Sequence, residues 1–231
     1  MTYTITIYRQ ERGSREHFWQ SFHYDAAGSG DSVASALTFL NRQPVLLDTE
    51  GKEARRISWE SSCLQKKCGA CAMVVNGYPR LACGTRLEEF RDRKIQLSPL
   101  RKFPLIEDLM VDREIMYQNL RTMELWLRED AALSDRDQEL AYQASECLQC
   151  GCCLEICPNF YAGGAFFGMA AVPITTRLLT EQDRAAIRDM RRNYRKHVFA
   201  GCGKSLACKT VCPKGIDTEE LLVNANRRSA W

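Results

Sequence analysis

The sequence has no run of about 20 apolar residues, the length that a membrane-spanning helix needs. Its residues 1–6 have neither the basic nor the apolar region of a secretion signal. We therefore expect a chain that is neither secreted nor itself transmembrane. Neither sign of charge dominates, since 32 Lys and Arg stand against 29 Asp and Glu, and the three histidines show no ligand spacing. What remains is the composition of a globular protein with one large or two small domains.

Cysteine, by contrast, is abundant. Twelve of the 231 residues are cysteine, a share above ordinary usage and below the roughly 8–10% of short secreted disulfide scaffolds. In a reducing cytosol, thiols at this density usually bind metal. We therefore expect metal centres rather than a disulfide framework.

The first half of the chain has the pattern of β-strands around a single helix. Asp31 or Ser32 can cap a helix whose apolar positions run from Val33 to Leu40. Asn76-Gly77 is a strong signal for a tight hairpin turn between two short strands. These features predict a small α+β domain with strands at residues 3–8, 18–24, 72–75 and 80–82.

A stiff segment separates this half from a second one. Residues 99–104 read Pro-Leu-Arg-Lys-Phe-Pro, which suits neither helix nor strand and predicts a hinge. We therefore expect two domains, at residues 1–103 and 104–231. The second has mostly helical patterning, with Thr218 as a candidate N-cap of its last helix. Its helices are expected at residues 106–128, 137–146, 180–195 and 218–228.

The first group of cysteines has the spacing of a plant-type [2Fe–2S] site. The pattern is C-x4-C-x2-C with a fourth cysteine after the hairpin, and Gly69 gives the loop the freedom to wrap closely around a cluster. A structural zinc site is the alternative, although zinc sites usually pair two short C-x2-4-C knuckles. The four expected ligands are Cys63, Cys68, Cys71 and Cys83.

The second group has the bacterial ferredoxin spacing C-x2-C-x2-C-x3-C-P, which ends at Cys157-Pro158. In this run the fourth cysteine ligates the other cluster of a two-cluster pair. A second run follows at residues 202–213, but Ser205 stands where its second cysteine is expected. Exchanging the fourth cysteines predicts one [4Fe–4S] set and one set of three thiols. These are Cys147, Cys150, Cys153 and Cys212 for the first set, and Cys157, Cys202 and Cys208 for the second.

Three thiolates suit a [3Fe–4S] cluster. The alternative is a fourth iron held by Ser205 or by water, although an alkoxide is a rarer ligand for iron–sulfur clusters. The assignment uses eleven of the twelve cysteines and leaves Cys152 as a spare thiol packed inside the fold.

Three clusters with no acid–base or nucleophilic residues placed around them describe an electron wire rather than a complete enzyme. Any redox-active organic cofactor is then expected on another protein. A basic stretch at residues 188–196 is most simply a solvated helix face or attracted to anionic lipid headgroups. We expect no nucleic-acid partner.

The order of these cysteine groups resembles one known family, the iron–sulfur subunits of succinate dehydrogenase and fumarate reductase, also called respiratory complex II. The resemblance covers nearly the whole chain, including residues 98–109 and 212–215. It implies an α+β chain with an N-terminal plant-type ferredoxin-like (β-grasp) domain followed by an all-α bacterial ferredoxin-like domain. It also implies a flavoprotein partner with FAD, which interconverts succinate and fumarate. A cytochrome b-type membrane anchor, often with haem, would complete the complex.

In this family, quinone reacts near the [3Fe–4S] cluster. The resemblance places Pro158 and Tyr161 in the vicinity of the quinone, but Ala162 and Gly203 replace the second aromatic residue and the histidine of typical ubiquinone-reducing members. We therefore expect menaquinone. The expected location is peripheral, at the cytoplasmic face of the inner membrane of a bacterium.

Two alternatives remain at this point. One is an iron–sulfur subunit of the heterodisulfide reductase or glycolate oxidase type, although those relatives usually complete both ferredoxin runs. The other is a structural metal protein or nucleic-acid binder whose clusters only brace the fold. Clusters that transfer electrons are reduced at physiological potentials, whereas clusters that only stabilise the fold need not be.

Overall fold

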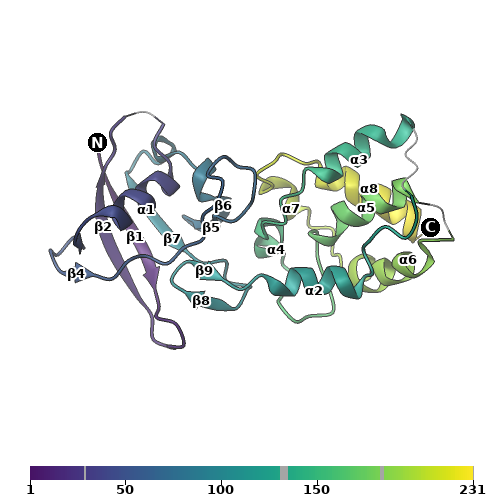
Figure 1. The fold of residues 1–231 in the computed structure, drawn as a ribbon, viewed down its shortest axis with the longest axis horizontal. Helices are drawn as coiled ribbons and strands as arrows, with labels where there is room; N and C mark the ends of the chain where they lie inside the picture. The colour runs from purple at the N-terminus through teal and green to yellow at the C-terminus, as the bar shows by residue number, and fades with distance from the viewer. Residues whose placement is uncertain (29, 131–134, 183–184, 231) are drawn as a thin grey trace. The chain divides into compact units, whose positions relative to one another are not determined.

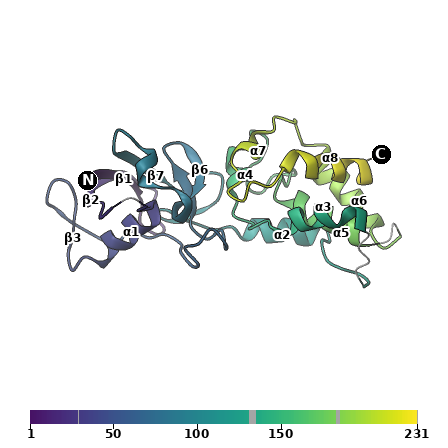
Figure 2. The ribbon, with the colours of Figure 1, turned by 90° about the horizontal axis from the view of Figure 1, so that it is seen from above.

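The computed structural model describes residues 1–28, 30–130, 135–182 and 185–230 (Figure 1). Contacts within the chain divide it into two units, Met1–Asp112 and Arg113–Trp231. The first unit is built on a β-sheet and the second is mostly helical, which confirms the expected α+β fold class (Figure 1, Figure 2). No helix in these described stretches is long and apolar enough to span a membrane.

The first unit contains a five-stranded sheet. Its strands are β1 (Thr2–Arg9), β2 (Phe18–Asp25), β5 (Ala72–Val75), β6 (Tyr78–Leu81) and β7 (Lys94–Ser98). They lie in the order β2-β1-β7-β5-β6, with β1 parallel to β7 and the other neighbours antiparallel. Alternate side chains of β1, among them Ile5 and Ile7, are fully buried, as the period of two predicts. The hairpin predicted at Asn76-Gly77 is confirmed by the pairing of β5 with β6, and the first two predicted strands pair as β1 and β2.

The helix α1 (Val33–Arg42) begins at the predicted cap. The Ser35 amide donates to Ser32 Oγ at 3.1 Å, and the Ser32 amide donates to Ser35 Oγ at 2.7 Å, so the two residues form a capping box. Leu37 of this helix is fully buried, which stabilises the fold by about 1.5–3 kcal/mol. The remaining short elements of the unit are β3 (Leu46–Leu47), β4 (Glu53–Ala54), η1 (Ala82–Gly84), η2 (Leu87–Glu89), β8 (Leu105–Glu107) and β9 (Met110–Val111).

The first unit extends beyond residue 103, so the expected hinge at residues 99–104 lies inside it. Leu100 and Phe103 are 0% and 4% exposed, which shows that this segment is packed rather than free to bend. The start of the helix expected at residues 106–128 is instead the β8–β9 hairpin, and α2 begins only at Glu114. The apolar residues of this stretch therefore lie first in two short strands and only then in a helix.

A buried carboxylate explains why residues 104–112 stay with the first unit. Asp108 accepts hydrogen bonds from the amides of Gln10 at 3.0 Å and Ser58 at 2.9 Å. The guanidinium of Arg55 donates to the same carboxylate at 2.6 Å, and the fully buried Arg9 lies 3.5 Å from it. Charge-assisted hydrogen bonds of this kind are among the strongest in proteins. They tie the β8–β9 hairpin to β1 and to the loop after β4.

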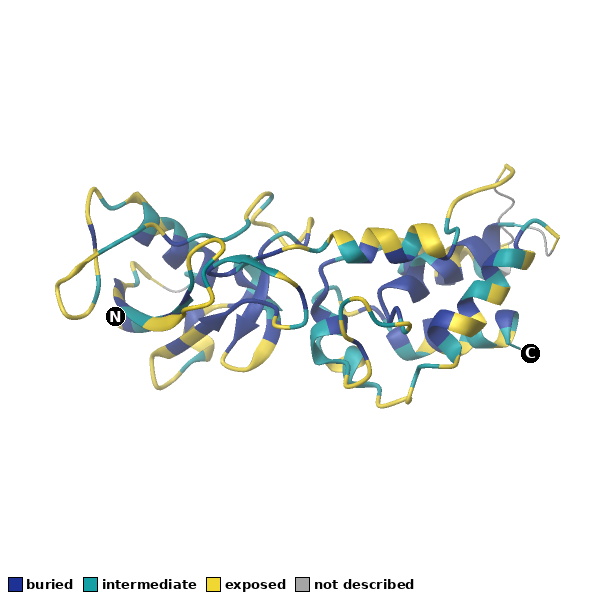
Figure 3. Ribbon diagram, turned by 90° about the horizontal axis from the view of Figure 1, so that it is seen from below, coloured by how far each residue is buried: buried dark blue, intermediate teal, exposed yellow. Residues whose placement is uncertain are grey.

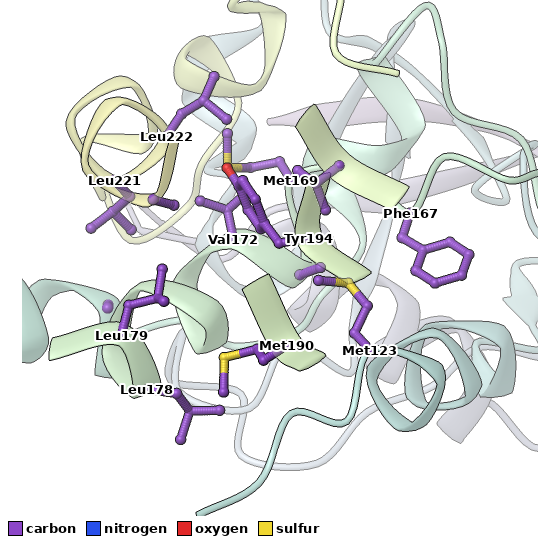
Figure 4. Packing of buried hydrophobic residues seen from close by; sticks show 14 of the residues in the cluster. Met123, Phe167, Met169, Val172, Leu178, Leu179, Met190, Tyr194, Leu221 and Leu222 are labelled. Atoms are coloured by element: carbon purple, nitrogen blue, oxygen red, sulfur yellow. The ribbon is translucent and has the colours of Figure 1, made fainter. Parts of the chain in front are cut away.

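The second unit packs its helices around an apolar core. This core includes Met123, Val172, Met190 and Tyr194 (Figure 4). Buried positions gather along the strands of the first unit and along the inward faces of these helices (Figure 3). The elements are α2 (Glu114–Thr122), η3 (Asp135–Asp137), α3 (Gln138–Ser145), α4 (Cys152–Ile156), α5 (Ala171–Glu181), α6 (Arg188–Tyr194), the π-helix η4 (Arg195–Phe199), α7 (Ala207–Thr210) and α8 (Thr218–Ser229).

Two helix predictions for this unit need correction. The helix expected at residues 180–195 is divided between the end of α5 and α6, and residues 183–184 lie outside the described part of the chain. The N-cap of α8 is Asp217 rather than Thr218, since Asp217 Oδ1 accepts from the amides of Glu219 and Glu220, both at 3.1 Å. The helix expected at residues 137–146 agrees with α3.

Candidate metal centres

The first four cysteines come together at a loop that precedes β5 and at the short η1. The Sγ atoms of Cys71 and Cys83 are 3.3 Å apart, and the Cys63 and Cys68 side chains also lie within hydrogen-bonding reach of each other. The four thiols therefore form two pairs. Such pairing suits a [2Fe–2S] core, in which each of two irons needs two thiolates.

Backbone amides of this loop point at the sulfur atoms. The amides of Gln65 and Lys67 donate to Cys63 Sγ, both at 3.3 Å, and the amide of Lys66 donates to Cys83 Sγ at 3.4 Å. The hydrogen bonds from Gln65 and Lys67, with a smaller contribution from Cys68, lower the pKa of the Cys63 thiol to about 7. Positive φ angles at Lys66 and Gly69, 57° and 77°, turn the loop inward. The loop is thus built to hold thiolates.

Burial acts in the opposite direction on one of these cysteines. Cys71, directly before β5, is buried, and this burial raises the pKa of its thiol to about 12. A bound metal, which requires the deprotonated form, overcomes such a penalty by direct coordination. This thiol therefore favours the protonated state until metal is present.

In the second unit, the structure brings the predicted [4Fe–4S] thiols around one space. Its apolar walls include Met169, Pro173 and Ile216. Cys212 arrives from beyond α7, far along the chain from the other three thiols, as the exchange of fourth cysteines requires. The thiols around this space are those of Cys147, Cys150, Cys153 and Cys212.

Hydrogen bonds and a nearby cation favour the thiolate of Cys150. The Cys152 thiol donates to Cys150, and together with the positive charge of Arg113 this lowers the pKa of Cys150 to about 7. The Arg113 guanidinium also donates to the Cys150 carbonyl at 3.3 Å. Burial raises the pKa of Cys147 to about 11. Cys152 is 0% exposed, so it is packed as expected and in addition contacts a predicted ligand.

The remaining three predicted thiols, Cys157, Cys202 and Cys208, surround a second space in the same unit. Ser205 lines this space too, at the position where the second ferredoxin run lacks a cysteine. Met169 is part of the lining of both spaces, so one side chain stands between the two thiol sets. The structure therefore groups the thiols into the two sets that the spacing predicts.

A close contact accounts for glycine at position 203. A Cβ placed on Gly203 would lie 2.9 Å from Asn159 Nδ2, and this Asn159 amide donates to the Gly201 carbonyl at 2.7 Å. A larger side chain at this position would displace Asn159.

The expected quinone residues lie outside the described lining of the third thiol set. Tyr161 is 65% exposed, and neither Tyr161 nor Pro158 is among the described residues that line the space around Cys157.

The roles of several residues in these centres were not predicted from the sequence. Asn159 and Phe166 line the third thiol set, while Gln149 and Thr218 donate hydrogen bonds to cysteine sulfurs. Only the position of Gln149 between two ligands could have indicated such a role. In the described part of the chain, no three His, Cys, Asp or Glu side chains converge on a position for a single metal ion.

Comparison with known proteins agrees with this arrangement. Residues 4–118 match the family described as "2Fe-2S iron-sulfur cluster binding domain", and residues 143–216 match "4Fe-4S dicluster domain". The succinate dehydrogenase iron–sulfur subunit of Bacillus subtilis is 32% identical over 207 residues, which cover 85% of this chain and 80% of the relative. The chain belongs to the family of iron–sulfur subunits of succinate dehydrogenase and fumarate reductase.

Other members of this family of iron–sulfur subunits are also similar. The fumarate reductase iron–sulfur subunit of Mycobacterium tuberculosis is 32% identical over 176 residues, covering 70% of this chain and 69% of the relative. A chain of the Mycobacterium smegmatis Sdh1 complex in the apo form has the same fold, with a TM-score of 0.74, 19% identity, and coverage of 99% of this chain and 96% of that one. As an iron–sulfur subunit of this family, the protein is part of an oxidoreductase complex.

Proposed function

We propose that this subunit relays electrons between a flavoprotein with FAD, which interconverts succinate and fumarate, and a membrane quinone. The observation that carries the proposal is the grouping of eleven cysteines into three sets of four, four and three thiols. Iron–sulfur clusters held by such sets supply one-electron transfer over a wide range of potentials. We propose electron transfer as the only chemistry of this subunit.

Each set of residues has a definite task in this proposal. Cys63, Cys68, Cys71 and Cys83 would hold a [2Fe–2S] cluster, and the loop amides would stabilise its thiolates. Cys147, Cys150, Cys153 and Cys212 would hold a [4Fe–4S] cluster. Cys157, Cys202 and Cys208 would hold a [3Fe–4S] cluster. Met169, which lines both spaces, and Val172, which lines the space of the third set, would exclude water from these last two clusters.

The partners follow from the family. We infer a flavoprotein subunit and a cytochrome b-type membrane anchor, with the subunit peripheral to the inner membrane of a bacterium on its cytoplasmic face. Menaquinone is the proposed electron acceptor or donor, because Gly203 and Ala162 depart from the pattern of ubiquinone-reducing members. Pro158 and Tyr161 are proposed to lie in the vicinity of the quinone.

The complex isolated through a tag on this subunit tests the proposal. Succinate is expected to bleach the cluster absorbance anaerobically, and a menaquinone analogue is expected to restore it faster than a ubiquinone analogue does. A co-purified flavoprotein that cannot reduce the clusters with succinate would contradict the proposed substrate. Faster recovery with the ubiquinone analogue would contradict the choice of quinone alone.

A further inference from the structure

Thr218, the first residue of α8, has a hydroxyl group that does not cap this helix. Asp217 caps α8, so the Thr218 side chain is released from the role that the sequence predicts. Thr218 is only 3% exposed, and its amide donates to the Ile216 carbonyl at 2.8 Å. Its Oγ1 donates to Cys208 Sγ at 3.7 Å. The buried hydroxyl is therefore aimed at a thiol of the third set.

The neighbouring thiol set has a side-chain donor of its own. Gln149 Nε2 lies 3.3 Å from Cys147 Sγ and 2.9 Å from the Ala170 carbonyl. A thiolate and a carbonyl are both acceptors, so the nitrogen of the amide has to face them. Besides the Cys152 thiol, which donates to Cys150, the two sets in the second unit thus receive side-chain hydrogen bonds from Gln149 and from Thr218.

A donor at a cysteine sulfur changes the balance between oxidised and reduced cluster. Reduction adds one electron, whose charge spreads over the sulfur atoms, and a hydrogen bond stabilises that added charge. The donor keeps its proton, and no bond forms or breaks. The reduction potential of the cluster therefore rises when the donor is present.

We propose that the Thr218 hydroxyl raises the reduction potential of the cluster held by Cys157, Cys202 and Cys208, and so favours the electron there. This inference rests on the proposed function, since it requires a cluster in the third set. Thr218 also lines the space of the [4Fe–4S] set, but its hydroxyl points at Cys208. Gln149 acts in the same way on the [4Fe–4S] cluster, so both donors contribute to the difference between the two potentials.

Redox titration of the whole complex, followed by electron paramagnetic resonance, tests this inference. Thr218→Val removes the hydroxyl and keeps the shape of the side chain. We expect the equilibrium constant for reduction of the third cluster to fall by up to about tenfold, which is about 59 mV for one electron. Thr218→Ser, which keeps the donor, is expected to restore most of the potential. The [2Fe–2S] potential is the internal control.

Gln149→Met is the matched variant for the other cluster. It is expected to lower the [4Fe–4S] potential and to leave that of the third cluster unchanged, the reverse of Thr218→Val. A Thr218→Val complex whose third cluster is intact and whose potential has not moved would overturn the inference. Equal shifts of both clusters in Thr218→Val would also overturn it, because they indicate a general structural change.

A measurement on the unaltered protein covers the case in which a variant loses its cluster. Pulsed paramagnetic resonance after exchange into D2O is expected to show one exchangeable proton coupled to the third cluster from the Thr218 side chain, and Thr218→Ser should keep it. Absence of this coupling in the unaltered protein overturns the inference alone. Absence of any third cluster there overturns the proposed function as well.

Discussion

Cys150 and Cys152 are two residues apart, and the structure gives them different surroundings. Cys150 lines the space shared by Cys147, Cys153 and Cys212, whereas Cys152 is fully buried behind it and donates to its sulfur. Spacing alone identifies which of the two belongs to the ferredoxin run. The contact between their thiols depends on the turn at Gly151, where φ is 88°, and no pattern of sequence letters indicates it.

We predict that Cys152→Ser is nearly silent and that Cys150→Ser is not. Serine keeps a donor toward Cys150 and costs about 1 kcal/mol of stability, whereas Cys150→Ser removes a proposed thiolate ligand of the [4Fe–4S] cluster. Iron and sulfide content of the purified complex measures the difference. A complex that loses iron in Cys152→Ser and retains it in Cys150→Ser would show that the ligand register is wrong.

Ser205 lines the space of the third thiol set, and we predict that Ser205→Cys converts this site. A fourth thiolate at the spacing of a complete ferredoxin run should capture a fourth iron and add negative charge, so the reduction potential should fall. Electron delivery to quinone would slow, while succinate oxidation with a soluble dye continues. Redox-titrated paramagnetic resonance measures the change; an unaltered three-iron signal at the original potential would refute it.

At the scale of elements, local signals predicted part of the first unit but missed the strand β7 (Lys94–Ser98). The capping box at Ser32 and the Asn76-Gly77 turn, with φ of 46° and 84°, each fix an element boundary through nearby residues. The β8–β9 hairpin was missed because Asp108 finds its partners far along the chain, at Gln10 and Ser58. Thr218 was assigned to the wrong role for a similar reason, since its target Cys208 lies on another helix.

The Asp108 contacts predict a large effect of a single substitution. Asp108→Ala leaves the buried Arg9 without its carboxylate and should lower the free energy of unfolding of the first unit by about 3–5 kcal/mol. Glu107→Gln removes a partly exposed partner of Arg55 and should cost less than about 1 kcal/mol. Anaerobic urea unfolding, followed by the visible circular dichroism of the [2Fe–2S] cluster, compares them. Equal effects would refute the anchoring role of Asp108.

At the scale of the whole molecule, each unit has little more than 110 residues. Domains of this size bury limited apolar area. Metal ligation is therefore expected to contribute to folding as it does in other small metalloproteins. Folding of the chain and binding of the clusters are therefore expected to be coupled.

Removal of iron should consequently unfold the chain. We predict that anaerobic chelation lowers the helical circular dichroism signal and abolishes cooperative melting, most of all in the second unit, where two thiol sets lie within one helical core. The untreated complex is the control. A chelated protein that keeps its full helical signal and melts cooperatively would contradict this prediction.

The central claim is a wire of three clusters whose last member has three irons, because the third set offers three thiols and a serine. Paramagnetic resonance of the oxidised complex, prepared anaerobically, tests it most directly. We predict the near-isotropic signal of a half-integer-spin three-iron cluster, which an oxidised [4Fe–4S]²⁺ cluster lacks. An oxidised complex with full iron content and no such signal would contradict the claim, and would indicate a four-iron cluster with Ser205 or water as its fourth ligand.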